Sequence, residues 1–280
     1  MMRSAAVVLM LVALAAPAFA QPGSAPIPTE LPDQIEPCEV CVKEKLELPQ
    51  LLQKALRADD RSMEHRLRDE NRQVRKIIET AWPTERVVAG SRVLDVASGG
   101  GYLAIIFSSL VGEGGHVDIH NTPGWIAQFP GMDPDMQRNW IKRPNIGWVT
   151  AGWNDLDAPD GSYDFILLGQ VYHDVVFEGG DFEALNERFF DMLSPGGRVI
   201  IEDHDAIETM PLMQQANLHR ISHGDVIGDF LAAGFRQVAF EEIESRYDDR
   251  KMNVFWPNVR GRTDRYILVF EKSLDGKPLR

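Results

Sequence analysis

The sequence has little cysteine, few basic residues and no apolar run long enough to span a membrane repeatedly. Only 2 of its 280 residues are Cys, which excludes a disulfide-dense scaffold and a four-cysteine zinc site. Lys and Arg number 29 against 42 Asp and Glu, for a formal net charge of −13. Because proteins hold nucleic acid mainly through Lys and Arg, this balance argues against a nucleic-acid partner. Hydrophobic residues, at 44%, suffice for an ordinary globular core.

The first twenty residues have the pattern of a secretory signal peptide. Arg3 precedes an apolar run over residues 5–16, and the small residues Ala18 and Ala20 precede Gln21. The run is shorter than the ~20 residues that a membrane-spanning helix needs. We therefore expect cleavage after Ala20, and a mature chain without membrane attachment in a bacterial periplasm or outside the cell.

Residues 21–50 form a proline-rich arm that carries both cysteines. Repeated prolines with few large apolar side chains are typical of a linker. Cys38 and Cys41 have the spacing of a small local disulfide or of a redox dithiol. No thioredoxin-like pattern surrounds them, so a structural staple or an unimportant pair is favoured.

Residues 51–85 are predicted to be an N-terminal helical segment. The apolar positions of a helix over 51–82 fall on one stripe: Met63, Leu67, Val74, Ile78 and Trp82. The opposite face gathers Arg61, Arg68, Arg72 and Arg75. Two interpretations are open. These arginines form a solvated face paired with nearby acids, or they help to close a site for an anionic group.

Residues 92–101 combine a short apolar strand with a glycine-rich turn, and residues 102–111 continue as a helix. Glycine allows a close ligand approach that a Cβ would block, and the helix begins with free N–H groups. The pattern Gly99-x-Gly101-x-x-Ala104 alone also fits the dinucleotide-binding loop of a nicotinamide oxidoreductase. Asp95 disfavours that alternative, because an acid at the strand end is placed to fix a ligand's charged tail through the turn.

The run from Val93 to Tyr102, VLDVASGGGY, resembles the first motif of class I S-adenosylmethionine-dependent methyltransferases, V-L-D-x-G-x-G-x-G. Further landmarks follow in the family's order over about residues 86–272: strands near 117–120, 146–150, 161–170, 193–202, 237–240 and 264–270. The resemblance implies an α/β, three-layer Rossmann-like domain over 86–280, with a seven-stranded, mostly parallel sheet and an antiparallel last strand. The chain is also similar to exported predicted methyltransferases of bacteria.

The resemblance implies S-adenosylmethionine as the cofactor. The residues that it assigns to the cofactor are Asp95, Ala97, Gly99, Gly101, His120, Asn121, Trp153, Asn154 and Gln170. His120 or Asn121 stands where the family has the acid that binds the ribose hydroxyls. Near Trp153, Asn154 or Asp155 stands in for the family's Asp beside the adenine. An imidazole or an amide can bond a hydroxyl, without the charge-assisted strength of a carboxylate.

Polar clusters follow the fourth and fifth strands of the resemblance, at the edge where open α/β sheets bind ligands. His173 is the first candidate for a base that takes the acceptor's proton, with Tyr172 or Asp174 orienting it, and His204 is the second. A divalent metal held by His173, His204 and nearby carboxylates is a less favoured alternative, so we expect no metal.

The sequence therefore predicts methyl transfer from S-adenosylmethionine to a small-molecule acceptor, with amines, phenols and thiols all open. The altered ribose and adenine positions favour one alternative, a non-catalytic ligand-binding protein that retains the methyltransferase fold. His219, Arg220 and His223 are interpreted as capping or surface groups, or as residues that line a lid.

Overall fold

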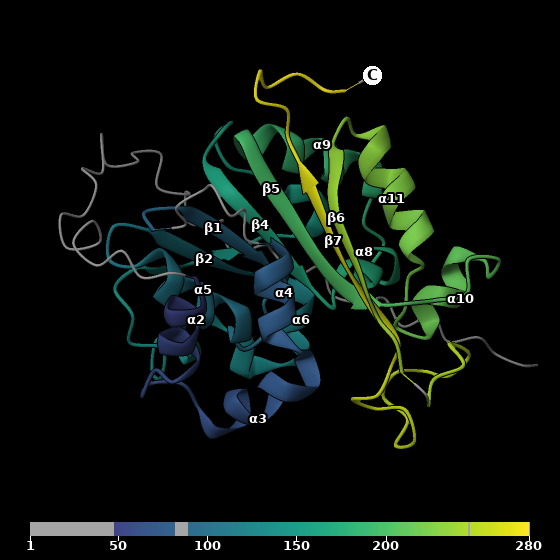
Figure 1. Ribbon diagram of the computed structural model, residues 1–280, viewed down its shortest axis with the longest axis horizontal. Coiled ribbons are helices and arrows are strands. Elements are labelled where there is room, and N and C mark those ends of the chain that lie inside the picture. Colours follow the sequence, from purple (N-terminus) through teal and green to yellow (C-terminus); the bar gives the residue numbers. More distant parts are fainter. Residues whose placement is uncertain (1–47, 82–88, 246, 280) are drawn as a thin grey trace, which may run out of the picture. The chain divides into compact units, whose positions relative to one another are not determined.

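The computed structural model describes residues 48–81, 89–245 and 247–279, with a seven-stranded sheet at the centre (Figure 1). The strands lie in the order β3-β2-β1-β4-β5-β7-β6. They are β1 (Arg92–Val96), β2 (His116–Asn121), β3 (Ile146–Thr150), β4 (Tyr163–Gly169), β5 (Leu193–His204), β6 (Arg236–Ile243) and β7 (Arg265–Glu271). Strands β1 to β5 are parallel, and β7 is antiparallel to both of its neighbours.

Helices cover both faces of this sheet, which confirms the predicted three-layer α/β fold (Figure 1). They are α2 (Leu48–Leu56), α3 (Met63–Arg72), α4 (Val74–Ala81), α5 (Tyr102–Val111), α6 (Pro123–Gln128), α7 (Pro134–Gln137), α8 (Tyr172–Phe177), α9 (Phe182–Met192), α10 (Leu212–Asn217) and α11 (His223–Ala232). Single 3₁₀ turns lie at η1 (Pro130–Met132) and η2 (Trp153–Asp155).

Alternation along the strands divides the apolar residues between two cores. On β1, Val93 packs into the cluster under α2, α4 and α5, whereas Leu94 and Val96 pack into the cluster under α9 and α11. Successive side chains of a strand point to opposite faces, so a strand covered by helices on both sides is apolar throughout. Asp95 interrupts this pattern and is only 2% exposed. A buried carboxyl group at the end of a central strand marks that end as a site.

The segment predicted as one helix over 51–82 is three helices. The chain leaves the helical conformation after Leu56, and the Ser62 hydroxyl caps α3 by accepting the His65 N–H at 3.1 Å. Gln73, with φ at 48°, then ends α3 before α4 begins. The single-helix prediction is therefore wrong, because the apolar spacing continues across two points where the helix is interrupted.

The predicted orientation of the first part of this segment is wrong as well. Met63 and Leu67 are 72% and 70% exposed, whereas Arg61 is 3% exposed. Helix α3 lies over polar loops at the end of the sheet and not over an apolar face, so its charged side packs inward. Trp82, the last residue of the predicted stripe, lies outside the described residues.

The predicted signal peptide, the proline-rich arm up to residue 47 and both cysteines also lie outside the described residues. Within the described ranges, no helix combines the length and the apolarity needed to cross a bilayer.

Candidate active site

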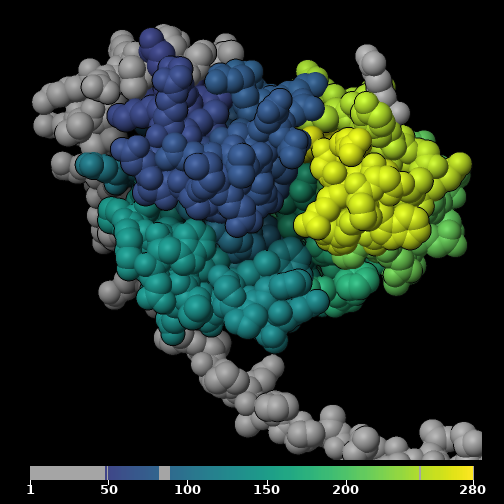
Figure 2. All heavy atoms as spheres, turned by 90° about the horizontal axis from the view of Figure 1, so that it is seen from below, coloured from purple at the N-terminus to yellow at the C-terminus, as the bar shows by residue number. Residues whose placement is uncertain are grey.

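The carboxyl ends of the parallel strands meet at one edge of the sheet, and Figure 2 looks onto that edge. Helix α3, in blue, the teal region between β2 and β3, and the yellow residues that precede β7 surround a hollow there. Ligands of open α/β sheets bind in such a position. The predicted cofactor and catalytic residues fall into two groups along this edge.

The glycine-rich turn lies between β1 and α5, as predicted. The Asp95 carboxylate accepts the Ser98 hydroxyl at 2.5 Å and the Ala104 N–H at 2.9 Å, and so joins the strand, the turn and the helix. Burial raises the pKa of Asp95 to about 6, although these two hydrogen bonds act in the opposite direction. Gly101 has φ at 78°, and a Cβ on it would lie 3.1 Å from Ile119 Cδ1. Glycine is therefore required where α5 starts.

His120 and Asn121, the predicted ribose-binding residues, hold the turn together. His120 Nδ1 accepts the Ala97 N–H at 3.2 Å, and Nε2–H donates to the Ala151 carbonyl at 2.9 Å. Asn121 accepts the Gly99 N–H at 2.8 Å and donates to the Gly99 carbonyl at 3.1 Å. Burial lowers the pKa of His120 to about 4, so the imidazole is neutral. Both ring nitrogens of His120 thus contact backbone groups, and ribose binding by His120 or Asn121 stays a prediction.

The turn and the adjacent helix α3 both have polar groups without a hydrogen-bond or ion-pair partner in the described ranges. Within the described ranges, the Gly100 N–H and the buried Nδ1 of His65 have no hydrogen-bond partner. The Arg68 guanidinium stacks on Tyr102 at 4.8 Å and forms no ion pair with a described residue. Burial and the neighbouring Arg72 lower the pKa of Arg68, which is the effect of holding a cation without an anion.

The other arginines of the predicted basic face are paired. Arg61 forms a two-point ion pair with Asp69 at 2.6 and 2.8 Å, and Asp69 also accepts the Tyr102 hydroxyl at 2.9 Å. Arg75 pairs with Glu79 on the surface. Of the two interpretations of this face, solvation therefore describes Arg75, whereas Arg68 has no ion pair within the described ranges.

Trp153 and Asn154, predicted at the adenine position, fix a loop across the edge. The Trp153 Nε1–H donates to Glu178 at 2.9 Å, and the same carboxylate oxygen accepts the Thr122 hydroxyl at 3.2 Å. Asn154 accepts the Asp181 N–H at 3.0 Å. Glu178, which follows α8, thus brings a carboxylate to the residue after β2. No pattern in the sequence indicated this position of Glu178.

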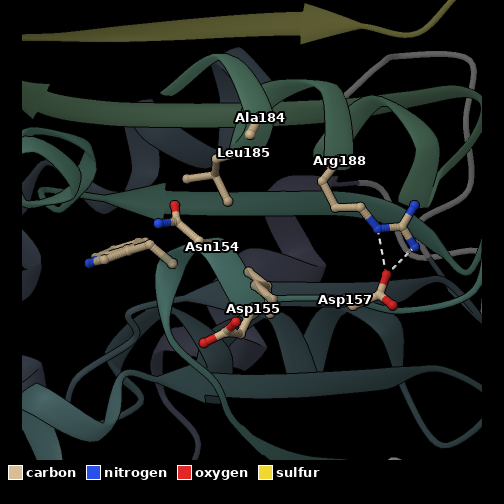
Figure 3. Close-up of a pocket in the computed structure, with 8 residues that line it drawn as sticks. Asn154, Asp155, Asp157, Ala184, Leu185 and Arg188 are labelled. Atoms are coloured by element: carbon tan, nitrogen blue, oxygen red, sulfur yellow. Dashed lines mark hydrogen bonds and ion pairs between the residues drawn. The ribbon is translucent and has the colours of Figure 1, made fainter. Parts of the chain in front are cut away.

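A hollow of about 520 Å³ lies on the outer side of this region, between η2 and α9 (Figure 3). Its lining is Trp153, Asn154, Asp155, Leu156, Asp157, Ala184, Leu185 and Arg188. The Arg188 guanidinium, drawn with dashed lines to Asp157, also pairs with Asp160 at 3.0 Å. The cation that lines this hollow is already neutralised by the protein's own acids.

Gln170, also assigned to the cofactor, is bound to β5. Its N–H donates to the Glu202 carbonyl at 2.6 Å, and its side-chain amide donates to the Glu202 carboxylate at 3.0 Å. That carboxylate is buried between Arg72 and Arg265, at 2.6 and 2.5 Å. Burial opposes its ionisation, but the two guanidinium groups outweigh burial and lower the pKa of Glu202. This network joins α3, β4, β5 and β7.

His173 lies at the start of α8 with a carboxylate on each side of its ring. Its Nδ1 lies 2.8 Å from Asp203 and its Nε2 lies 3.3 Å from Asp174, and the side chain is 3% exposed. His219 Nδ1 lies 3.3 Å from the same Asp174 oxygen. Burial opposes protonation of His173, but Asp203 and Asp174 together raise its pKa. A free base needs an unpaired nitrogen, so this arrangement does not describe His173 acting alone.

Tyr172 does not orient His173, and that part of the prediction is wrong. Its hydroxyl accepts the Asn186 amide at 2.6 Å and lies 3.3 Å from Asp229, in the core under α9 and α11. Asp203 orients His173 instead. His204, the second candidate base, contacts the Thr263 hydroxyl through Nδ1 at 2.8 Å.

Two residues after β5 also differ from their predicted surface roles. Arg220 is fully buried and forms a two-point ion pair with Asp248 at 2.8 and 2.9 Å. His219, next to it, joins the His173 cluster. No spacing in the sequence identified His219, because it reaches the cluster through the separate helix α10. His223 is the first residue of α11 and contacts Asp205 at 3.2 Å, whereas the hydroxyl of Ser222 caps this helix.

A model of the family described as "Methyltransferase domain" matches residues 63–245 of the chain. The chain belongs to this methyltransferase-domain family. The resemblance to class I methyltransferases is thereby confirmed, and S-adenosylmethionine is the cofactor of that class. A curated relative, the ubiquinone/menaquinone biosynthesis C-methyltransferase UbiE of Vibrio vulnificus, is 32% identical over 115 residues. That match spans 40% of this chain and 40% of the relative.

Solved structures share the fold at low identity. A SAM-dependent methyltransferase from Aquifex aeolicus has a TM-score of 0.52 and 18% identity, and the match covers 79% of this chain and 97% of that one. The [4+2]-cyclase SpnF has a TM-score of 0.51 and 16% identity, with 73% and 81% covered. Because a methyltransferase and a [4+2]-cyclase share this fold, the fold alone does not determine the acceptor.

The polar groups near the turn fit the amino-acid end of S-adenosylmethionine, which carries an ammonium and a carboxylate group. Asp95 supplies a buried carboxylate beneath the turn. The unpartnered Gly100 N–H and the guanidinium of Arg68 supply a donor and a positive charge. Near the end of β2, the Glu178 carboxylate lies beside Thr122 and Trp153. Its Oε1 atom has no hydrogen-bond partner in the described ranges.

Proposed function

We propose that the protein transfers a methyl group from S-adenosylmethionine to a small-molecule acceptor at the hollow on the carboxyl edge. One observation carries this proposal. Unsatisfied groups at the glycine turn and a cluster of two histidines and two carboxylates lie at the same edge of one sheet. The cofactor supplies an electrophilic methyl group, and the protein must mainly hold the acceptor in line with it.

Three residues are assigned to the cofactor. Asp95 holds the ammonium group, because a buried carboxylate without a counter-ion gains most from a cation. Arg68 and the Gly100 N–H hold the carboxylate, and Arg68 is preorganised for this by its stacking on Tyr102. These roles explain why α3 turns its charged face inward.

The acceptor side points to an apolar molecule with one protonated oxygen or nitrogen atom. Phe177 and Phe255 are 53% and 55% exposed, and their rings lie 5.4 and 4.8 Å from that of His219. Exposed aromatic rings beside a polar cluster suit an acceptor that has an apolar body. The cluster of His173, Asp174 and His219 then receives the polar atom that accepts the methyl group.

Calorimetric titration of the folded mature protein with S-adenosylmethionine and S-adenosylhomocysteine tests the cofactor site. Both compounds should bind, and Asp95→Asn should weaken binding by about 10²-fold or more, because the ammonium group loses its charge partner. Asp160→Asn is the matched control, since Asp160 is exposed and pairs with Arg188. The control should bind as the unmodified protein does.

Two outcomes would contradict the proposal. If a well-folded sample bound neither sulfur compound, the site would not be a methyl-donor site. If it bound both but methylated no phenol, amine or thiol in a panel, the non-catalytic ligand-binding alternative would replace it.

We also propose that the chain is exported and begins at Gln21 when mature. The pattern of residues 1–20 supports this proposal. Mass spectrometry of the periplasmic fraction of a bacterium that expresses the full sequence should find an N-terminus at Gln21. A chain that retained its first twenty residues in the cytoplasm would contradict it.

A further inference from the structure

Three side chains on the acceptor side bring one metal-binding atom each close to the others. They are His173 through Nε2, Asp174 through Oδ1 and His219 through Nδ1. These three atoms all lie within 4.8 Å of one another. Asp174 is central, since its Oδ1 lies 3.3 Å from each of the two ring nitrogens.

The two distances suit a shared cation better than direct pairing. Charge-assisted N–H···O contacts are about 2.7–2.9 Å long. Two ligands bound at about 2.0–2.1 Å in a tetrahedral arrangement lie about 3.3 Å apart. The observed separations have that length. In the described ranges, moreover, the Asp174 carboxylate is paired with no Arg or Lys.

Asp203 prepares His173 for such a role. The Asp203 carboxylate is fully buried, contacts Nδ1 of His173 at 2.8 Å, and accepts the backbone N–H groups of His173 and His204 at 3.2 and 2.7 Å. A carboxylate held in this way fixes the proton on Nδ1, so that a metal ion which displaces the proton of Nε2 can bind on the side that faces Asp174. Metal-binding histidines commonly donate their second ring nitrogen to a carboxylate in this manner.

His219 is held in place by its surroundings. Its φ of 54° is uncommon for a non-glycine residue. The following residue, Arg220, is fully buried in its ion pair with Asp248 and fixes this conformation. His219 itself is 22% exposed, between the rings of Phe177 and Phe255. The cluster is therefore closed on the His173 side and accessible on the His219 side.

We propose that His173, Asp174 and His219 bind a divalent cation of the zinc type, which contacts the acceptor. Three protein ligands leave one position free, as in catalytic zinc sites. We place that position on the side of Phe177 and Phe255. There a bound cation would lower the pKa of an acceptor hydroxyl group and fix its orientation. The catalytic part of this inference rests on the proposed methyl transfer, but binding of the cation does not. His219 replaces His204 in the metal alternative that the sequence suggested.

Titration of the metal-free mature protein, without a histidine tag, with Co²⁺ and then Zn²⁺ tests the site directly. The visible absorption of Co²⁺ reports its coordination by protein ligands, and calorimetry gives the affinity for Zn²⁺. We expect one equivalent of metal to bind. His219→Ala and Asp174→Asn should each weaken binding by 10²-fold or more.

His116→Ala is the matched control. His116 also lies beside an acid, with Nε2 at 3.0 Å from Asp118, but it stands at the start of β2 and so at the opposite edge of the sheet. The His116→Ala variant should bind metal as the unmodified protein does. His219 is partly exposed, so its loss should leave the fold intact, and circular dichroism of each variant checks this.

The proposal is overturned if the unmodified protein binds neither metal, or if His219→Ala binds as tightly as the unmodified protein. The same samples are titrated with S-adenosylhomocysteine. Cofactor binding without metal binding would end this inference alone, whereas metal binding without cofactor binding would end the proposed methyl transfer and leave the metal site standing.

Discussion

Two histidines at the carboxyl edge of the sheet, His120 in β2 and His173 at the start of α8, show how little residue type alone determines a role. Both are buried and each has contacts at both ring nitrogens. His120 contacts only backbone groups, and burial lowers its pKa. His173 contacts two carboxylates, and its pKa is raised. The first ring therefore holds a turn in place, whereas the second belongs to a cluster of side chains.

The same contrast distinguishes the two sides of the carboxyl edge. On the cofactor side, the last two side chains of β2 satisfy the backbone of the glycine turn, and in the proposed function Asp95 and α3 bind the charged groups. On the acceptor side, the side chains after β4 and β5 satisfy one another. A substitution on one side should therefore change the geometry of the turn, and one on the other side should change chemistry.

The largest effect is expected from Asp203→Asn, which breaks the acceptor side alone. Without the carboxylate, His173 loses the partner that fixes its tautomer, and methyl transfer should slow by about 10³-fold. The affinity for S-adenosylmethionine should stay within about twofold, because Asp203 contacts no residue of the turn. Turnover with an acceptor found by the panel, together with calorimetry, checks both. A parallel loss of cofactor affinity would show that the two sides are not separate.

Arg72→Met breaks the network that connects the two sides. Glu202 would keep Arg265 as its only cationic partner in a buried position, and stability should fall by about 3–4 kcal/mol. Arg75→Met removes an exposed pair with Glu79 and should cost less than about 0.5 kcal/mol. Urea unfolding of the two variants measures the difference. Equal losses would mean that the inward face of α3 is no more important than its solvated face.

His120→Asn breaks the cofactor side through its dependence on pH. The folded-state pKa of His120 is about 4, against 6.5 for the free side chain, so below pH 6.5 the unfolded chain takes up a proton that the folded chain excludes. Stability that is present at pH 7 is thus lost as the pH falls from about 6.5 to about 4, by about 3 kcal/mol in total. Asn lacks this titration and keeps an acceptor for the Ala97 N–H.

The difference between the two stability curves isolates this effect. Asp95, whose raised pKa of about 6 acts with the opposite sign over the same pH range, is present in both proteins. Urea midpoints from pH 4 to pH 7 should converge at the acid end. Parallel curves would refute the assignment of a neutral imidazole.

The smallest effect is expected from Gln73→Gly. Gln73 is exposed and left-handed at the end of α3, a conformation that costs a residue with a Cβ about 1–2 kcal/mol. Glycine loses more conformational entropy on folding, which offsets part of this gain. The free energy of unfolding should therefore rise by about 0.5 kcal/mol. Thermal unfolding measures it. A loss of stability would show that the Gln73 side chain makes a contact of its own.

The sequence predicted the strand, turn and helix over residues 92–111 because that unit is local. Asp95, the glycines and the apolar run of α5 lie within twenty residues, and their spacing determines the geometry. The family resemblance then supplied the order of the remaining strands. The sequence also placed His173 and Asp174 at a strand end, where the structure has them.

What the sequence could not predict depends on contacts between distant segments. His219 meets Asp174 only because α10 packs against α8. The inward face of α3 depends on Glu202, 130 residues later. The backbone contacts of His120 could not be predicted, because a polar residue at a strand end suits a ligand and a backbone group equally well. Only the positions of the Ala97 N–H and the Ala151 carbonyl decide between them.

The contacts of Arg265 imply an order in which parts of the chain fold. It donates to the main-chain carbonyl groups of Asn71 and Arg72, up to 194 positions earlier in the chain, while it neutralises Glu202. Contacts this distant form late, because the intervening chain must first be brought together. A polypeptide that emerges from its N-terminus can build β1, the turn and α5 early, but it cannot fasten α3 over them until β7 has arrived. The cover of the turn is therefore completed only after Arg265, 193 and 194 positions further along the chain than these two partners, has been synthesised.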